Sequence, residues 1–246
     1  KIDENVISLI PDYSREAVSE LIKMDDFVDL IIPRGGEKLI RYINNNSNIP
    51  VIKHDKGLCH LYIDKYADIQ KAINIAINSK TQRVGVCNAI ETLLIHKDIS
   101  SRILSQLERA FKDTNTELRV CEKTNQIINA KLASDLDFHT EYLDNILSIK
   151  IIDSLEEAIS HIEHYGSSHS DSIISEDYES VNTFLNLVDS ACVYANASTR
   201  FTDGSVFGLG AEVGISTNRL HARGPMGIND LTTYKFKIYG NGQIRK

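Results

Sequence analysis

Hydrophobic and polar residues follow two alternating patterns along the chain. The clearest helical pattern covers residues 67–80, where apolar side chains recur every three or four positions and share one face. Short, largely apolar runs such as Val28–Pro33 and Thr92–His96 are typical of strands buried on both faces of a parallel sheet. Repeated alternation of the two patterns predicts an α/β fold.

Capping residues predict where several of these elements begin and end. Asp12 or Ser14 is expected to cap a first helix, because short polar side chains accept hydrogen bonds from the first turn. Ser154 with Glu157 forms a capping box, and Gly166 is placed to end the helix that follows. Further strands are expected over residues 49–53, 57–64, 171–175 and 191–194.

The end of the chain carries a different pattern. From Thr233 to Tyr239, apolar side chains alternate with lysines, which predicts a strand with one dry and one wet face. A single amphipathic strand needs a hydrogen-bonding partner. We therefore expect this segment to take part in a contact between subunits.

Composition and charge exclude several classes of protein. A net charge of -7 argues against a general nucleic-acid surface, which needs clustered Lys and Arg, and no apolar run reaches membrane-spanning length. The start of the chain, Lys1–Glu4, has no apolar segment of the kind that directs secretion. Because it also lacks Met, we expect the 246 residues to be a piece of a longer protein, with one or two domains.

The four cysteines have neither zinc-binding nor disulfide-framework spacing, which favours a reduced, cytoplasmic protein without a metal. Cys192 lies in an apolar run, Cys59 in an expected strand, and Cys121 at the edge of a polar stretch. Cys87 differs, because it lies between a glycine turn and Asn88, at the junction of a helix and a strand. A junction of this kind suits a reactive thiolate, although a buried structural thiol is an equally good interpretation.

Two polar segments are candidates for binding an anion. Arg34-Gly35-Gly36 lies between an expected strand and an expected helix, where backbone N–H groups can point at a phosphate; a plain turn is the simpler interpretation. Residues 196–201 follow an expected strand and contain Asn, Ser, Thr and Arg, which suit a carboxylate or phosphate. A polar turn explains their composition equally well.

The segment Gly208–Gly214 is similar to a dinucleotide-binding fingerprint, but we reject that interpretation. Its last glycine is one residue late, no strand leads directly into it, and no helical pattern follows. A glycine loop near a site, or a structural bend, is the better prediction.

Long and specific blocks extend over nearly the whole chain: IIPRGGEKLI, IPVIKHDKG, GLCHLYID, SKTQRVGVCNAIETLLIH, VDSACVYANASTRFTDG, FGLGAEVGISTNRLHARGPMG and LTTYK. In these blocks the chain resembles the γ-glutamyl phosphate reductases of the aldehyde dehydrogenase superfamily. The resemblance is to the C-terminal part of that family. It implies the remainder of a Rossmann-like NADPH-binding domain over residues 1–54, an α/β catalytic domain over 55–216, and a returning segment with an oligomerisation strand over 217–246.

The resemblance also implies a reaction. The Cys87 thiolate would attack the γ-carbonyl of L-glutamyl 5-phosphate, expel phosphate and leave a thioester, which hydride from NADPH would reduce to L-glutamate 5-semialdehyde. This reaction belongs to proline biosynthesis. The implied cofactor-binding residues are Arg34, Gly35, Gly36 and Glu141, and the implied substrate-binding residues are Asn88, Asn196, Ser198, Thr199 and Arg200.

Two positions depart from related sequences. Val84 replaces the Pro of many members of the family, which loosens the turn before Cys87. Lys53 or His54 falls where hydrolytic aldehyde dehydrogenases keep a Glu that activates water, which fits a thioester meant for hydride.

The resemblance implies a homo-oligomer and a functional association with glutamate 5-kinase. Two alternatives stay open. The chain could belong to a bifunctional pyrroline-5-carboxylate synthase, or it could act alone as a non-catalytic structural domain.

Overall fold

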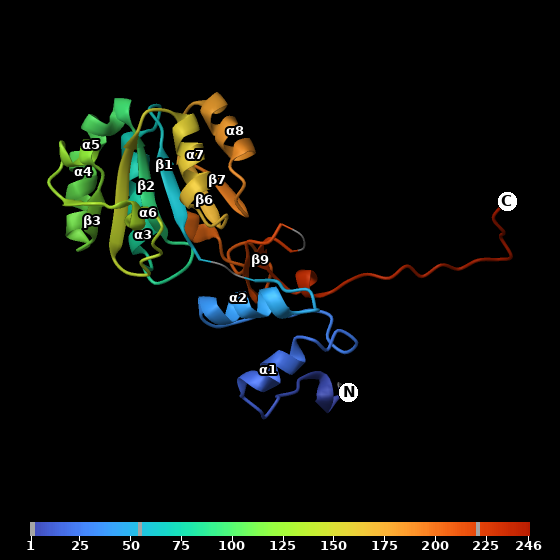
Figure 1. Cartoon of the computed structure of the whole chain (residues 1–246). Helices are drawn as coiled ribbons and strands as arrows, with labels where there is room; N and C mark the ends of the chain where they lie inside the picture. The colour runs from blue at the N-terminus through green and yellow to red at the C-terminus, as the bar shows by residue number, and fades with distance from the viewer. Residues whose placement is uncertain (1–2, 54–55, 220–221) are drawn as a thin grey trace.

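The computed structural model describes residues 3–53, 56–219 and 222–246, and at its centre is a seven-stranded sheet with helices on both faces (Figure 1). The strand order is β4-β3-β5-β2-β1-β6-β7, and every neighbouring pair is parallel. The strands are β1 Cys59–Ile63, β2 Ile90–His96, β3 Glu117–Val120, β4 Lys131–Leu132, β5 Ile146–Ile152, β6 Ser170–Ile174 and β7 Cys192–Ala195. The predicted α/β class is confirmed.

The two faces of the sheet are covered by different helices, because neighbouring strand residues point to opposite sides. In β1, Leu61 and Ile63 pack in one apolar cluster with α3 and α4, while Tyr62 packs in another with α7 and α8. The helices are α1 Arg15–Leu21, α2 Glu37–Asn46, α3 Ile69–Thr81, α4 Lys97–Asp113, α5 Glu122–Asn125, α6 Asp135–Phe138, α7 Leu155–Tyr165 and α8 Tyr178–Leu187, with short 3-10 helices η1 Glu4–Val6, η2 Thr199–Phe201 and η3 Asn229–Leu231. In the described parts of the chain, no helix is long and apolar enough to cross a bilayer.

Most of the predicted element ends are confirmed. Ser14 caps α1, accepting a hydrogen bond from Ala17 N at 3.1 Å. Ser154 caps α7 in the same way through Glu157 N at 3.2 Å, and Gly166 is the C-terminal cap of that helix. The Glu157 carboxylate accepts from Asp153 N rather than from Ser154 N, so the expected capping box is displaced by one residue.

The strands predicted at Val28–Pro33 and 49–53 are not formed at full length. A single parallel bridge, Ile31 to Val51, connects these two segments. They lie beside α2, away from the sheet (Figure 1). Within the two segments, Pro33, Ile49 and Ile52 are buried.

Residues 233–239, predicted to form a strand that pairs with another subunit, form no strand within this single chain. Strands β8 Gly214–Ser216 and β9 Gly224–Met226 form an antiparallel pair, but residues 232–246 contain no helix or strand and run away from the body of the molecule (Figure 1). Tyr234 and Phe236 are 80% and 81% exposed. A strand requires a hydrogen-bonded neighbour, and the described chain offers none to this segment.

Candidate active site

Two hollows lie at opposite edges of the parallel sheet. All strands point the same way, so the residues that follow β1, β2, β5 and β6 meet at one edge, here called the carboxyl edge. The residues that precede these strands meet at the other edge, here called the amino edge. The carboxyl-edge hollow has a volume of about 450 Å³ and the amino-edge hollow about 1080 Å³.

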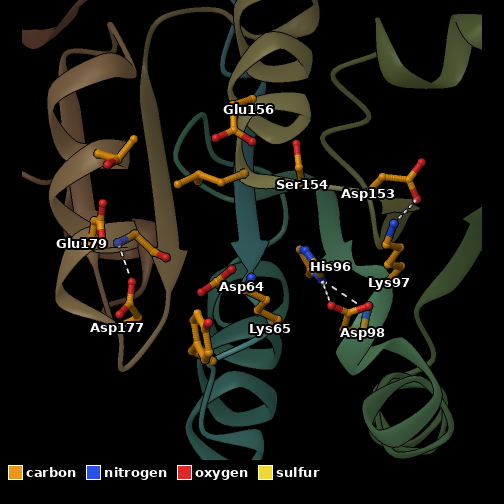
Figure 2. A pocket seen from close by; sticks show the side chains of 14 residues that line it. Asp64, Lys65, His96, Lys97, Asp98, Asp153, Ser154, Glu156, Asp177 and Glu179 are labelled. Atoms are coloured by element: carbon orange, nitrogen blue, oxygen red, sulfur yellow. Dashed lines mark hydrogen bonds and ion pairs between the residues drawn. The ribbon is translucent and has the colours of Figure 1, made fainter.

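The polar groups of the carboxyl-edge hollow serve the local structure (Figure 2). Asp64 is buried and accepts hydrogen bonds from Tyr62 Oη at 3.0 Å and Ser175 Oγ at 2.7 Å. His96 caps α4 through Asp98 N, and Asp177 caps α8 through Ser180 N. The exposed carboxylate of Asp153 pairs with Lys97 and Lys123. These contacts explain the polarity of the hollow without a ligand.

The amino-edge hollow brings together several of the predicted residues. It lies between the amino edge and α2, and the predicted residues in its wall are Gly35, Gly36, Cys87, Glu141 and Lys53, which was expected at the position of the hydrolytic Glu. Gly36 is the N-terminal cap of α2, and a Cβ added there would meet no atom within 4 Å. Free space at the N-terminus of a ten-residue helix suits a phosphate group. Arg34 is not part of this wall, because its guanidinium donates to the carbonyl of Val213.

Cys87 lies in the segment 82–89 that connects α3 with β2, as its place between a helix and a strand predicted. It is half-buried. Burial first, and then the carboxylates of Glu141 and Glu212, raise the pKa of the Cys87 thiol to about 11, while the Arg200 guanidinium acts in the opposite direction. In the described chain the thiol is therefore protonated at neutral pH. A positive charge brought to this edge would favour the thiolate.

The backbone of Cys87 is held by residues in and just before β1. The Cys59 thiol donates to the carbonyl oxygen of Cys87 at 3.1 Å. Gly57 packs directly on the same peptide: a Cβ added there would lie 2.1 Å from that oxygen, which is far inside a van der Waals contact. Glu141 Oε1 in turn accepts from Gly57 N at 2.8 Å. The position of Cys87 therefore depends on contacts far from it in sequence.

Asn88 and three of the predicted substrate residues brace this segment. Asn88 is buried; its amide donates to the Thr202 carbonyl at 2.7 Å and its backbone carbonyl accepts from Thr199 Oγ1 at 2.6 Å. Ser198 is also buried and accepts from Ser79 Oγ at 3.0 Å. Arg200 is half-buried, and its guanidinium donates to Gln82 and to the side chain of Asn88.

Asn196 is not brought to the Cys87 group. It lies beyond β7 at the carboxyl edge, where its side chain exchanges two hydrogen bonds with the backbone of Ser175. Its φ of 54° is in the left-handed region, and the chain reverses there toward the amino edge. Asn196 therefore lies beyond the strand end as expected, but it does not form one group with Ser198, Thr199 and Arg200, which lie beside Ser79 and Asn88 at the amino edge.

Two further expectations can be compared with the structure. Gly208–Gly214 leads into β8 and contains no helix, which agrees with a glycine loop rather than a dinucleotide fingerprint. Among the described residues, no group of three or more His, Cys, Asp or Glu side chains could hold a metal ion. His54, one of two residues expected at the position of the hydrolytic Glu, lies outside the described residues.

Comparison with known protein families identifies the fold family. The model of the aldehyde dehydrogenase family matches residues 1–136, which is more than half of the chain. The chain belongs to the aldehyde dehydrogenase family. A solved structure called γ-glutamyl phosphate reductase from Thermotoga maritima superimposes with a TM-score of 0.93 at 45% identity, covering 96% of this chain and 57% of that one. An acetylating aldehyde dehydrogenase from Geobacillus thermoglucosidasius, at 20% identity and a TM-score of 0.70, covering 99% of this chain and 63% of that one, shares the fold.

Two relatives within the aldehyde dehydrogenase family are similar over essentially the whole chain. A γ-glutamyl phosphate reductase of a Nitratiruptor species is 63% identical over 246 residues, which is 100% of this chain and 60% of that protein. One from Nautilia profundicola is 62% identical over 245 residues, again covering 60% of that protein. The chain thus spans about three fifths of the length of the curated relatives it matches.

Sequence reasoning missed the residues that hold Cys87 within this aldehyde dehydrogenase fold. The sequence presents Gly57 only as the start of a strand, and Cys59 only as a member of that strand. Glu212 is part of the rejected glycine segment, yet its carboxylate influences the Cys87 thiol. A glycine next to a strand is the one available signal, since it often marks a close backbone approach.

Proposed function

We propose that this chain carries the nucleophile of a γ-glutamyl phosphate reductase, which reduces L-glutamyl 5-phosphate to L-glutamate 5-semialdehyde and phosphate in proline biosynthesis. The observation that carries the proposal is Cys87 in the wall of the amino-edge hollow, close to Glu141 and to the glycine turn before α2. The identity of 63% to a protein with this name supplies the substrate class. The complete activity is proposed for the whole protein to which the chain contributes.

In the proposed reaction, the Cys87 thiolate attacks the γ-carbonyl carbon and the bond from that carbon to the phosphate oxygen breaks. Phosphate leaves, and the acyl group is held as a thioester on Cys87 Sγ. The pKa of about 11 holds with the Arg200 guanidinium already lowering it, so the resting thiol needs a further positive charge to ionise at neutral pH. Arg200 lies in η2, outside the 82–89 segment, and donates hydrogen bonds to Gln82 and Asn88 of that segment. We assign it the role of favouring the thiolate and attracting the anionic substrate.

Membership of the aldehyde dehydrogenase family implies a nicotinamide cofactor, and the described residues fit one. Gly36 leaves room beside the N-terminus of α2 for a phosphate group, with Gly35 next to it in the wall of the hollow, and Glu141 offers a carboxylate for a ribose hydroxyl. When bound, the cofactor supplies the hydride that reduces the thioester. We propose NADPH as the cofactor; Arg34, predicted to bind it, would have to release the Val213 carbonyl to do so.

The domain boundaries follow the same proposal. Residues 1–54 with α1 and α2 would contribute to the cofactor domain, 55–216 with the central sheet to the catalytic domain, and 217–246 to the returning segment. The exposed apolar side chains of the tail support a strand that pairs with another subunit of a homo-oligomer. A cytoplasmic location and an association with glutamate 5-kinase belong to this proposal as expectations.

The test is acylation of the chain by acetyl phosphate, a simple acyl phosphate, followed by intact and peptide mass spectrometry. We expect one acetyl group on Cys87 in the wild type and none in Cys87→Ala. Cys121→Ala is the matched control, because Cys121 is also half-buried but lies at the start of α5. Acetylation that persists in Cys87→Ala, or that is found on Cys121, would contradict the proposal.

Turnover is tested separately, by phosphate-dependent oxidation of glutamate semialdehyde with NADP. The whole protein should show it and its Cys87→Ala variant should not. Calorimetry of NADPH binding to residues 1–246 distinguishes the proposed function from the alternative of a non-catalytic structural domain. That alternative predicts neither NADPH binding nor acetylation.

A further inference from the structure

A buried ion pair lies under the segment that carries Cys87. Lys80 Nζ donates to Glu91 Oε2 at 2.7 Å, and the two side chains are 0% and 1% exposed. Burial lowers the pKa of the Lys80 ammonium and raises that of the Glu91 carboxyl, and in both groups it outweighs their mutual attraction. Apolar residues of similar volume often replace such a pair without loss of stability. Stability alone therefore does not explain why two charges are placed here.

The location of the pair is more informative than its energy. Lys80 is in the last turn of α3 and Glu91 is the second residue of β2 (Figure 1). The segment 82–89, with Cys87 near its end, connects these same two elements. The ion pair therefore connects the two ends of the Cys87 segment and fixes the distance between them.

Glu91 also makes a second contact, through its other oxygen. Glu91 Oε1 accepts a hydrogen bond from Leu143 N at 3.2 Å. Leu143 has a φ of 51°, a left-handed conformation that a leucine adopts only when its surroundings impose it. Two residues earlier is Glu141, which contacts Gly57 and so reaches the backbone of Cys87 from the other side. One carboxylate thus links both segments that meet at the thiol.

We propose that Lys80 and Glu91 are positioning residues, which hold the 82–89 segment and the Glu141–Leu143 segment in a fixed relation so that the Cys87 thiol faces the amino-edge hollow. The significance of this arrangement for a reaction rests on the proposed function of Cys87. The positioning itself is independent of substrate, because it concerns only the environment of the thiol. The competing explanation is an ion pair that stabilises the fold and has no influence on Cys87.

The experiment measures the pH profile of Cys87 alkylation by iodoacetamide in the full chain, read for each cysteine by peptide mass spectrometry. The main variant is Lys80→Met/Glu91→Leu, which removes both charges together and so leaves the net charge near Cys87 unchanged. We expect it to melt cooperatively, while the midpoint of Cys87 alkylation falls by about half a pH unit or more, roughly a threefold change in thiolate fraction. The midpoint should fall because a released segment exposes the thiol and relieves the burial that raises its pKa.

The control is Lys71→Met/Glu176→Leu. Lys71 is also on α3 and pairs with Glu176 at 2.9 Å, but both side chains are at least half exposed. This variant should keep the wild-type profile. A wild-type profile in Lys80→Met/Glu91→Leu would overturn the proposal, as would an equal shift in the control variant.

A second variant covers the case in which the main one does not fold. Lys80→Arg/Glu91→Asp keeps both charges and nearly the same volume, but the shorter acid withdraws from Leu143 N. The proposal expects the same direction of shift, and an unchanged profile would overturn it. Alkylation needs no acyl phosphate, so a failed acetylation test would leave this result standing and would contradict the proposed function alone.

Discussion

The two edges of the sheet contain similar types of residue but use them in different ways. At the carboxyl edge, the helices are capped by His96, Ser154 and Asp177. Each carboxylate oxygen of Asp64 there accepts a hydrogen bond from a hydroxyl group. At the amino edge, Cys87 lines a hollow of about 1080 Å³ with a carboxylate and a glycine turn in its wall. The presence of polar residues alone does not distinguish a functional site from a structural edge. The two are distinguished by whether each polar group is already hydrogen-bonded within the local structure.

The difference has a cause in the topology. In a parallel sheet, each strand runs into a helix whose first N–H groups need acceptors, so the carboxyl edge requires capping side chains. At the amino edge, helices end and strands begin, and the connecting segments are less constrained by capping. A thiol can be presented there by close backbone packing, as Gly57 does for Cys87.

The largest expected effect tests that packing. In Gly57→Ala, the added methyl group would lie 2.1 Å from the Cys87 oxygen and 2.5 Å from its Cα, so the backbone must move. We expect a loss of about 3 kcal/mol in the free energy of unfolding, measured by urea denaturation. Gly85→Ala is the control, because Gly85 is exposed and its methyl group would meet only the Leu143 carbonyl oxygen at 3.7 Å, an ordinary contact, so stability should change by no more than about 0.5 kcal/mol. Equal stability of the two variants would show that the close approach of Gly57 to the Cys87 peptide does not contribute to the stability of the fold.

The second effect concerns pH and a residue between the two edges. His161 on α7 is 4% exposed, and burial, together with His60, Lys150, His164 and His139, lowers its pKa from 6.5 to about 2. Below pH 6.5, His161 therefore binds a proton in the unfolded chain but not in the folded chain, so the free energy of unfolding falls as the pH falls. Between about pH 6.5 and pH 5 this contributes a loss of about 2 kcal/mol.

The matched variant for this prediction is His161→Phe, which keeps a ring against Phe138 but does not titrate. Urea denaturation at both pH values should show the acid-induced loss reduced by that amount in the variant. An identical loss in both proteins would mean that the response comes from the carboxylates at the edges instead.

The third effect tests whether the carboxyl edge is purely structural. Ser154→Ala removes the hydrogen bond to Glu157 N at the start of α7 and should cost about 1 kcal/mol of stability. Alkylation of Cys87 should not change. Ser160→Ala, at an exposed position on the same helix, is the control for the loss of a hydroxyl group. An altered alkylation rate of Cys87 in Ser154→Ala would show that the carboxyl edge influences the amino edge.

The smallest effect on stability concerns the tail, which extends away from the sheet (Figure 1). Removal of residues 234–246 should change the free energy of unfolding by no more than about 0.5 kcal/mol, because their side chains are exposed. The proposed subunit strand would nevertheless be lost, so the native mass from light scattering should fall to that of the monomer. An unchanged oligomer would contradict the role proposed for this segment.

The sequence predicted the central sheet well and its surroundings poorly. The helical periodicity over 67–80 corresponds to α3, and the apolar run Thr92–His96 lies within β2. Both patterns arise because these residues are buried against neighbouring helices and strands. Val28–Pro33 has the same apolar character, but it forms a single bridge to Val51 and only Pro33 within it is buried. Apolar character predicts that a segment packs against the rest of the protein, and it does not say how deeply or against which elements.

For the site, local sequence marked Cys87 as a junction residue and left its role open; the family resemblance supplied the reaction. The first came from neighbouring residues, and the second from blocks that extend over nearly the whole chain. The positions of Asn196 and Arg200 came from neither, although they are close in sequence: the left-handed turn at Asn196 leaves one side chain at the carboxyl edge and returns the other to Asn88.

The sequence by itself determined the alternation of helices and strands, the caps at Ser14 and Ser154, and the family to which the chain belongs. Only the tertiary structure decided that Gly57, Cys59 and the Lys80–Glu91 pair surround the Cys87 segment. The physical reason is range. Periodicity and capping depend on neighbours within a few residues, whereas the setting of the thiol depends on side chains that parallel strand order brings together from distant parts of the chain.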